Sequence, residues 1–183
     1  MKKYNPDRLV SVTAIIVSVG TLFMILYQTN LMRKEQKASV MPSLMIGYSV
    51  NQNDDELTEK IWLANRGLGP AFIEKVAVID EDKVYETDPY GYLYETNANE
   101  NTVTINRLYP GRIIPANDGI ELYVKGTNAN SKIVLSDLFE FPYDIENMPS
   151  DNDNKVVVEI TYKNIYDDKW TIRSDMTSPL VMD

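Results

Sequence analysis

Acidic side chains are the groups in this sequence best suited to chemistry, because the chain contains no cysteine and no histidine. Without those residues there is no thiolate nucleophile, no Ser-His-Asp triad and no zinc site with the usual nitrogen and sulfur ligands. A pair such as Asp144 and Glu146 could supply the acid and base of a glycosidase. However, 27 of the 183 residues are acidic, so such pairs arise from composition alone. We therefore predict that the chain is not an enzyme.

Two polar strings are candidates for binding an ion or a phosphate. Asp151–Asn154 offers oxygen ligands that suit calcium, but Lys155 stands where an EF-hand places a ligand, and no closing glutamate follows at the right spacing. Asn65–Ala71 contains two glycines but lacks the Lys-Ser/Thr pair and the helix of a phosphate-binding loop. We interpret the first string as a surface loop and predict no metal and no cofactor.

The second string is better explained as a structural turn. It reads Asn-Arg-Gly-Leu-Gly-Pro-Ala and lies between two apolar runs. Gly67 and Gly69 can take positive φ, the Asn65 side chain can bond the backbone two residues on, and Pro70 fixes one dihedral angle before the next strand. The spacing predicts a specified structural turn formed by these four residues.

At this turn the chain resembles a broad group of uncharacterised bacterial proteins with one N-terminal membrane span and a β-sandwich that contains Asn-x-Gly-x-Gly-Pro-Ala. Gln28, Gln36 and Pro42 match the group's polar helix that ends at a proline, and Ile160–Tyr162 before Trp170 is similar to its final hairpin. The resemblance covers most of the chain, and the turn is its specific part. It implies an architecture and a place in the bacterial inner membrane, but no catalytic residues.

Among the elements that must carry these residues, the first is a membrane span. Residues 9–27, which follow a short tail of residues 1–8, contain no charge, Asn, Gln or Pro. As a helix they extend roughly 28 Å, close to the ~30 Å hydrocarbon core of a bilayer. A cleaved signal peptide is the alternative, but its apolar region is ~7–15 residues long and precedes a small-x-small site, which is missing here.

One face of this span carries small residues. Ser11, Ala14, Ser18 and Thr21 follow the spacing i, i+3, i+7 and i+10. Small side chains let two helices approach closely in lipid, so this face is a candidate for self-association. The alternative is that a single span merely tolerates these residues.

Residues 28–41 contain strong helix formers without Gly or Pro, so we expect the helix to continue as a stalk until Pro42 stops it. The cations on either side of the span are equal in number: Lys2, Lys3 and Arg8 before it, and Arg33, Lys34 and Lys37 after it. Arg8 adjoins the span, whereas Arg33 lies six residues beyond it. The positive-inside rule then favours a cytoplasmic N-terminus and an extracytoplasmic C-terminal domain.

Residues 42–183 change to the alternating pattern of strands. Strands are predicted at about 44–50, 59–64, 72–79, 83–86, 102–106, 120–125, 156–163 and 169–173. The last two form a hairpin, residues 88–101 are predicted as a loop, and residues 133–141 fit either helix or strand. Many short strands separated by turns indicate a mainly β fold, an immunoglobulin-like antiparallel β-sandwich.

The domain that follows Pro42 is strongly acidic, with 12 basic and 25 acidic residues and a net charge of −13. We predict that it does not bind nucleic acid, and that its partners are neutral, cationic or bridged by a divalent ion. Plain solubility would give the same charge. Seven tyrosines could form a recognition surface for a peptide or a sugar, or could pack in the core: Tyr85, Tyr90, Tyr92, Tyr94, Tyr109, Tyr123 and Tyr143.

The sequence therefore predicts a non-catalytic interaction or sensor module that is held in the lipid bilayer and binds an unidentified protein or ligand. The alternative is an oligomerising membrane effector, pore-forming or membrane-disrupting, in which the sandwich is a regulatory domain.

Overall fold

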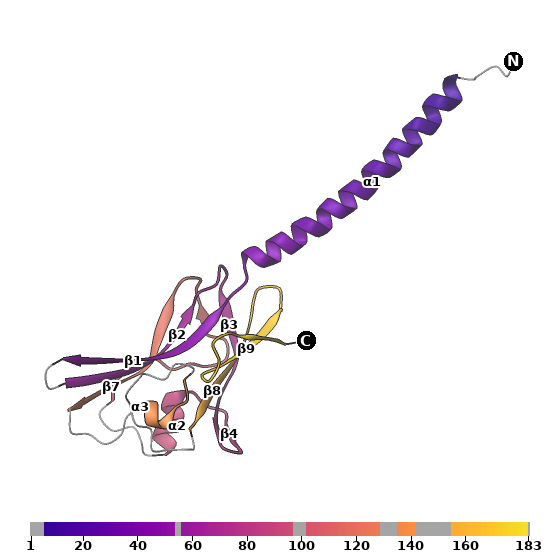
Figure 1. Ribbon diagram of the computed structural model, residues 1–183. Coiled ribbons are helices and arrows are strands. Elements are labelled where there is room, and N and C mark those ends of the chain that lie inside the picture. The colour runs from indigo at the N-terminus through magenta and orange to yellow at the C-terminus, as the bar shows by residue number, and fades with distance from the viewer. Residues whose placement is uncertain (1–5, 54–55, 97–101, 129–134, 142–154, 183) are drawn as a thin grey trace. The chain divides into compact units, whose positions relative to one another are not determined.

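The computed structural model describes residues 6–53, 56–96, 102–128, 135–141 and 155–182. The chain divides into two compact units, residues 1–39 and residues 40–183, which we call the β domain. Figure 1 shows the elements of each unit in chain order.

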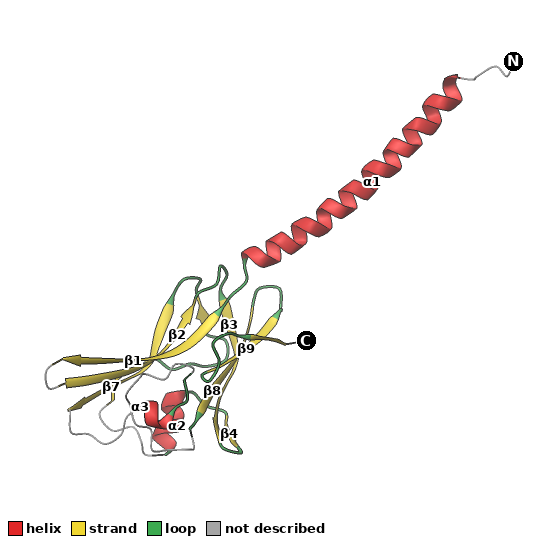
Figure 2. Cartoon of the chain, viewed as in Figure 1, coloured by secondary structure: helices red, strands yellow, loops and turns green. Residues whose placement is uncertain are grey.

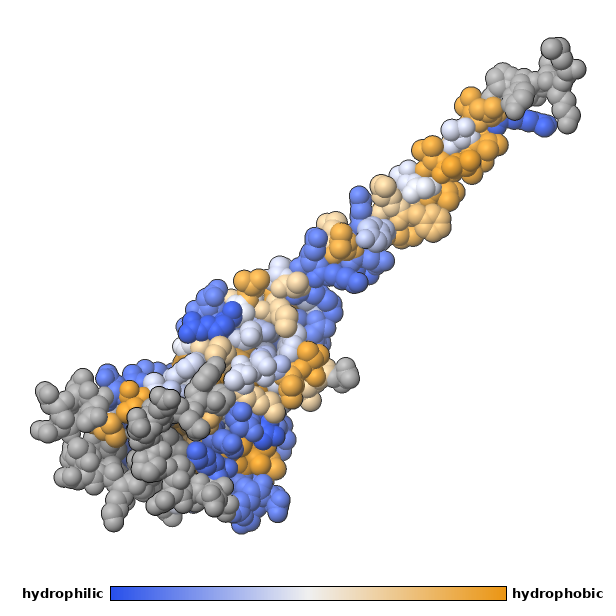
Figure 3. All heavy atoms as spheres, viewed as in Figure 1, coloured by the Kyte–Doolittle hydropathy of each residue, from blue (hydrophilic) through white to orange (hydrophobic). Residues whose placement is uncertain are grey.

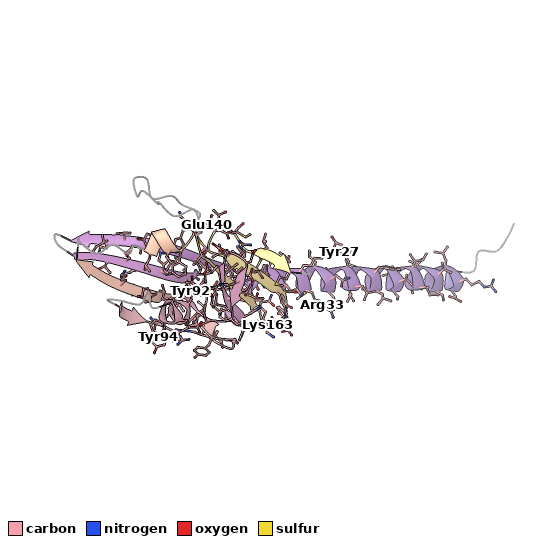
Figure 4. The ribbon with its side chains drawn as sticks, turned by 90° about the horizontal axis from the view of Figure 1, so that it is seen from below. Tyr27, Arg33, Tyr92, Tyr94, Glu140 and Lys163 are labelled. Atoms are coloured by element: carbon pink, nitrogen blue, oxygen red, sulfur yellow. The ribbon has the colours of Figure 1, made fainter. Side chains whose placement is uncertain are left out.

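The first unit is one helix, α1 (Pro6–Ser39), of 34 residues. Its apolar side chains are exposed around the whole circumference, as the apolar colouring of Figure 3 shows for the visible side. The helix is long and apolar enough to cross a membrane, and none of its most apolar window is buried within the protein. It continues past Tyr27 and Arg33, which Figure 4 marks, and ends three residues before Pro42.

The β domain consists of two antiparallel sheets, drawn in yellow in Figure 2. The first has the order β1-β2-β7-β5, with β1 (Leu44–Asn53), β2 (Glu56–Asn65), β7 (Gly119–Asn128) and β5 (Thr102–Ile105). The second has the order β10-β9-β8-β3-β4, with β10 (Leu180–Met182), β9 (Lys169–Arg173), β8 (Val157–Lys163), β3 (Ala71–Asp80) and β4 (Lys83–Tyr85). A short strand, β6 (Ile113–Ile114), pairs with the start of β3. The prediction of a mainly β fold after one apolar helix is confirmed.

A common core joins the two sheets, because alternate residues of each strand point inward. Leu44 and Ile61 from the first sheet lie in one buried cluster with Val78, Val158 and Ile160 from the second. In register, Val78 pairs with Val158 across the β3–β8 ladder. Burying each such side chain contributes about 1.5–3 kcal/mol, so this core is the main source of stability of the β domain.

Two short helices modify the predicted pattern. The loop prediction for residues 88–101 is wrong in part, because α2 occupies Pro89–Glu95. Asp88 caps this helix by accepting a hydrogen bond from the Gly91 N–H at 2.9 Å, and Pro89 suits its first turn. Within the ambiguous residues 133–141, α3 (Leu135–Leu138) is helical, and Phe139 then forms an isolated bridge with Val156.

Candidate functional site

The turn at residues 65–71 is organised by the buried side chain of Asn65. Its Oδ1 accepts hydrogen bonds from the Gly67 N–H at 3.0 Å, as the sequence predicts, and from the Ser43 N–H at 3.1 Å. Its Nδ2 donates to the carbonyl oxygens of Gly69 at 2.8 Å and Ile114 at 3.1 Å. One amide therefore joins the start of β1, the turn and β6, which is a structural role.

The two glycines of this turn have a different role from the predicted one. Neither Gly67 nor Gly69 has positive φ, in contrast to Gly111, whose φ is 91°. They are glycines because residues 40–43 cross directly over them: a Cβ on Gly67 would overlap the backbone of Met41, and a Cβ on Gly69 would overlap that of Val40. The expectation of positive φ is therefore wrong, and close approach of the backbone explains the motif.

The predicted helix–helix face lies on α1, where its residues are exposed. The hydroxyls of Ser11, Ser18 and Thr21 donate to the carbonyl oxygens four residues earlier, each at 2.8 Å. With Ala14 they form a stripe whose polar groups are satisfied within the helix, as a lipid environment requires. Self-association through this face stays a prediction.

Several acidic candidates lie outside the described residues: Asp144, Glu146 and the string Asp151–Asn154, together with Tyr143. Within the described ranges, no group of three or more acidic side chains is placed to hold a metal ion.

Most of the other tyrosines pack within the β domain. Tyr92 and Tyr123 are buried, and Tyr90 lies against the core with its ring 6.4 Å from that of Tyr123. The Tyr92 hydroxyl donates to Asp80 at 3.0 Å; burial, and then this contact with Asp80, raise the pKa of Tyr92. Tyr94, by contrast, lies at the surface in Figure 4. An exposed surface built from many tyrosines is therefore not observed in the described part of the chain.

The β domain has a cleft of about 470 Å³ beside β3, which we call the β3 cleft. Three segments line it: residues 74–76 of β3, residues 86–88 after β4, and residues 107–110 before β6. Apart from Tyr109, no residue of these segments was predicted as a site residue from the sequence.

The wall opposite β3 is fixed by Asp88. This carboxylate is buried and accepts hydrogen bonds from the Arg107 Nε at 2.7 Å and the Leu108 N–H at 2.9 Å, besides capping α2. The Arg107 guanidinium lies 5.4 Å from the centre of the Tyr90 ring. These contacts hold the guanidinium of Arg107 in a defined position at the edge of the cleft.

The remaining charges of the cleft differ in how firmly they are paired. Glu74 is bound by Lys169 at 2.6 Å and Lys163 at 3.3 Å, and the hydrogen bond from Lys169, followed by that from Lys163, lowers its pKa. Lys75 and Glu86 are 3.4 Å apart and both exposed, so their pairing is weak. The cleft can thus exchange the Lys75–Glu86 contact for contacts with a bound molecule.

A second cluster of charges is buried between the sheets. Glu59 and Lys125 are directly opposite each other in the β2–β7 ladder, and both side chains are buried. Oε1 of Glu59 accepts hydrogen bonds from the Tyr48 hydroxyl and from the Leu135 N–H, the latter at 2.9 Å. Because the Glu59 carboxylate joins α3 to the first sheet through the Leu135 N–H, we assign this cluster a structural role.

Chemically, the β3 cleft offers two cations, an exposed aromatic ring at Tyr109 and the polar edge of a strand. This combination suits noncovalent binding of a small polar or peptide group. The Asp88-Pro89 capping pattern was the signal in the sequence that could have located one wall. The pairing of Asp88 with Arg107 is long-range and leaves no local pattern.

Comparison with protein-family models, with curated proteins and with solved structures finds no match to this chain.

Proposed function

We propose that the chain is a membrane-anchored interaction or sensor module, in which α1 spans a bilayer and the β domain binds a partner at the β3 cleft without catalysing a reaction. One observation carries the proposal: a helix whose most apolar stretch is long enough to cross a membrane, and is not buried within the protein, precedes a domain with its own core. Exposing such a helix to water would be very unfavourable, whereas a bilayer accommodates it.

We further propose that the β domain is an immunoglobulin-like sandwich. The order β1-β2-β7-β5 corresponds to strands A, B, E and D of such domains, and β9-β8-β3 corresponds to G, F and C. The chain has no cysteine for the inter-sheet disulfide of antibody domains. The rings of Tyr162 and Trp170 stack with their centres 5.8 Å apart within the same core.

The proposal also keeps the cellular placement that the sequence favours: a bacterial inner membrane, a cytoplasmic N-terminus and an extracytoplasmic β domain. The resemblance to bacterial single-pass proteins and the position of Arg8 beside the span support it. Protease added to spheroplasts should remove the β domain. If the β domain is fully protected from the protease until the spheroplasts are lysed, the orientation is the opposite one, with the β domain in the cytoplasm.

The experiment that tests binding is photo-crosslinking in intact membranes. A photoreactive phenylalanine analogue at Tyr109, which is exposed in the β3 cleft, should yield a discrete adduct. The matched control is the same analogue at Tyr94, which is equally exposed but does not line the cleft. No adduct from position 109, or the same adducts from both positions, would contradict the proposal. Leakage of vesicles that contain the chain would instead favour a membrane effector.

A further inference from the structure

The edge of β3 that faces away from β8 is covered at both ends and open in the middle. β6 pairs with Ala71 and Phe72, and β4 pairs with residues 78–80. Next to β6, the Ile73 N–H donates to the Arg112 carbonyl at 2.9 Å, and its carbonyl accepts from the Gly111 N–H at 2.8 Å. Within the described residues, no strand pairs with residues 74–77 on this side, and this gap is the β3 cleft.

The backbone of Val76 points into the gap. The side chains of Ile73, Val76 and Val78 all lie in the core, and a bulge around Glu74 explains the three-residue step between the first two. Residues of a strand whose side chains share a face direct their N–H and C=O groups to the same edge. Since the hydrogen bonds of Ile73 point away from β8, those of Val76 must do so as well. An N–H and a C=O from one residue match the backbone of an extended peptide.

The two ends of the gap favour a bound peptide that terminates inside the gap over a peptide that runs through it. Ile73 and Val78 are five residues apart, which corresponds to roughly 17 Å of strand. β6 and β4 occupy the line of the edge at the two ends. A peptide that continued in both directions would have to bend out of the sheet twice, whereas a terminus bends only once.

The charges of the gap favour a carboxyl terminus. Lys75 and Arg107 are half-exposed, and among the described residues the terminal nitrogens of Arg107 have no hydrogen-bond partner on an acidic side chain. Of the acids that line the cleft, Asp88 and Glu74 are held by the contacts described above, which leaves Glu86 accessible. A guanidinium matches a carboxylate in charge and geometry, while a terminal ammonium would meet two cations.

We propose that the β3 cleft binds the C-terminal end of an extended polypeptide: its last residues pair with the backbone of Val76, and its terminal carboxylate binds Arg107. The inference rests on the proposed function, because it assigns a partner chemistry to the same cleft.

The test uses the full chain in lipid nanodiscs and fluorescence anisotropy. The probes are fluorescein-labelled hexapeptides with randomised last four residues, each synthesised as the free acid and as the amide. The best free-acid peptides should bind about tenfold or more tightly than their own amides. If no peptide binds below about 1 mM, or if acid and amide bind equally, the proposal is overturned.

Charge variants locate the binding. Lys75→Glu should weaken binding about threefold or more, and Glu86→Lys should strengthen it by a similar factor. Lys83→Glu is the matched control, because it makes the same charge change at an exposed position of β4 outside the cleft. All three positions are exposed, so the fold is retained. If Lys75→Glu and Lys83→Glu weaken peptide binding equally, the effect comes from the overall charge of the domain, and the proposed site is refuted.

Hydrogen exchange tests the strand addition itself. The best free-acid peptide should slow exchange at the Val76 amide more than at the amides of α2; the reverse order would overturn the pairing. Alkaline extraction of the same preparations separates the two proposals. If the chain stays in the membrane and crosslinks from position 109, but binds the free-acid and amide peptides equally, only this inference is overturned. If the chain binds the free-acid peptides but is released from the membrane by alkali, only the proposed membrane-anchored function is overturned.

Discussion

Replacing Glu59 with glutamine is expected to destabilise the β domain strongly. The Glu59 side chain is 0% exposed and Lys125, opposite it in the ladder, is 2% exposed. Oε1 of Glu59 also binds the Leu135 N–H and the Tyr48 hydroxyl. Glutamine has nearly the same shape and keeps an acceptor oxygen. The substitution therefore removes the negative charge and weakens the hydrogen bonds from the Leu135 N–H and the Tyr48 hydroxyl.

The magnitude follows from the burial of the Glu59 carboxylate and its two hydrogen bonds. A hydrogen bond to a charged group contributes about 1.5–3 kcal/mol, and a buried donor left without its acceptor costs about 1–3 kcal/mol. We expect a loss of about 3 kcal/mol for Glu59→Gln, whose neutral oxygen weakens both hydrogen bonds, and about 5 kcal/mol for Glu59→Ala, which removes them.

Urea unfolding followed by tryptophan fluorescence measures these changes. Trp62 in β2 and Trp170 in β9 are the two tryptophans of the chain, so α1 does not contribute to the signal. The free energy of unfolding falls with urea concentration by about 2 kcal/mol/M, so a loss of about 3 kcal/mol in stability lowers the urea midpoint by about 1.5 M. Midpoints of Glu59→Gln and Glu59→Ala within about 0.3 M of the wild type would refute the reasoning.

Three further outcomes are expected. Gly67→Ala and Gly69→Ala should each lower the free energy of unfolding by at least about 1–3 kcal/mol, because the added Cβ would overlap backbone atoms. At Gly111 the added Cβ meets open space, so Gly111→Ala should lower it by only about 1 kcal/mol. Equal urea midpoints for all three variants would contradict this. Burial raises the pKa of Tyr162 from 10.0 to about 12, so its neutral hydroxyl stabilises the fold below pH ~10 and this contribution is lost as pH rises towards ~12. Stability measured across that range should fall more for the wild type than for Tyr162→Phe, and parallel curves would show that the hydroxyl is not responsible. A fragment of residues 40–183 should be soluble with a β-type circular dichroism spectrum; a helical spectrum or insolubility would contradict the independence of the β domain.

Elements with a local pattern could be predicted from the sequence. The uncharged run at residues 9–27 located the most apolar part of α1, and alternation located the longer strands, because burial of one face imposes a period of two. α2 has no such pattern. Its signal in the sequence is the cap at Asp88 and Pro89, which the loop prediction for residues 88–101 leaves out. The strands β6 and β10 have only two and three residues and are too short for alternation to reveal.

The candidate site could not be predicted because distant residues form it. Asp88 and Arg107 are 19 positions apart, and the gap in the β3 edge exists only because β6 and β4 stop short of each other. The glycines of the turn illustrate the same limit. Their positions were recognised, but the reason for them is the crossing of residues 40–43, which turn chemistry alone does not predict.

The most direct test of the membrane-anchored binding module is alkaline carbonate extraction of membranes after photo-crosslinking from position 109. If α1 is integral to the bilayer and a partner is bound at the β3 cleft, as proposed, both the chain and its adduct should remain in the membrane pellet. A folded chain released into the supernatant, or a pellet that contains the chain without any adduct, would contradict it.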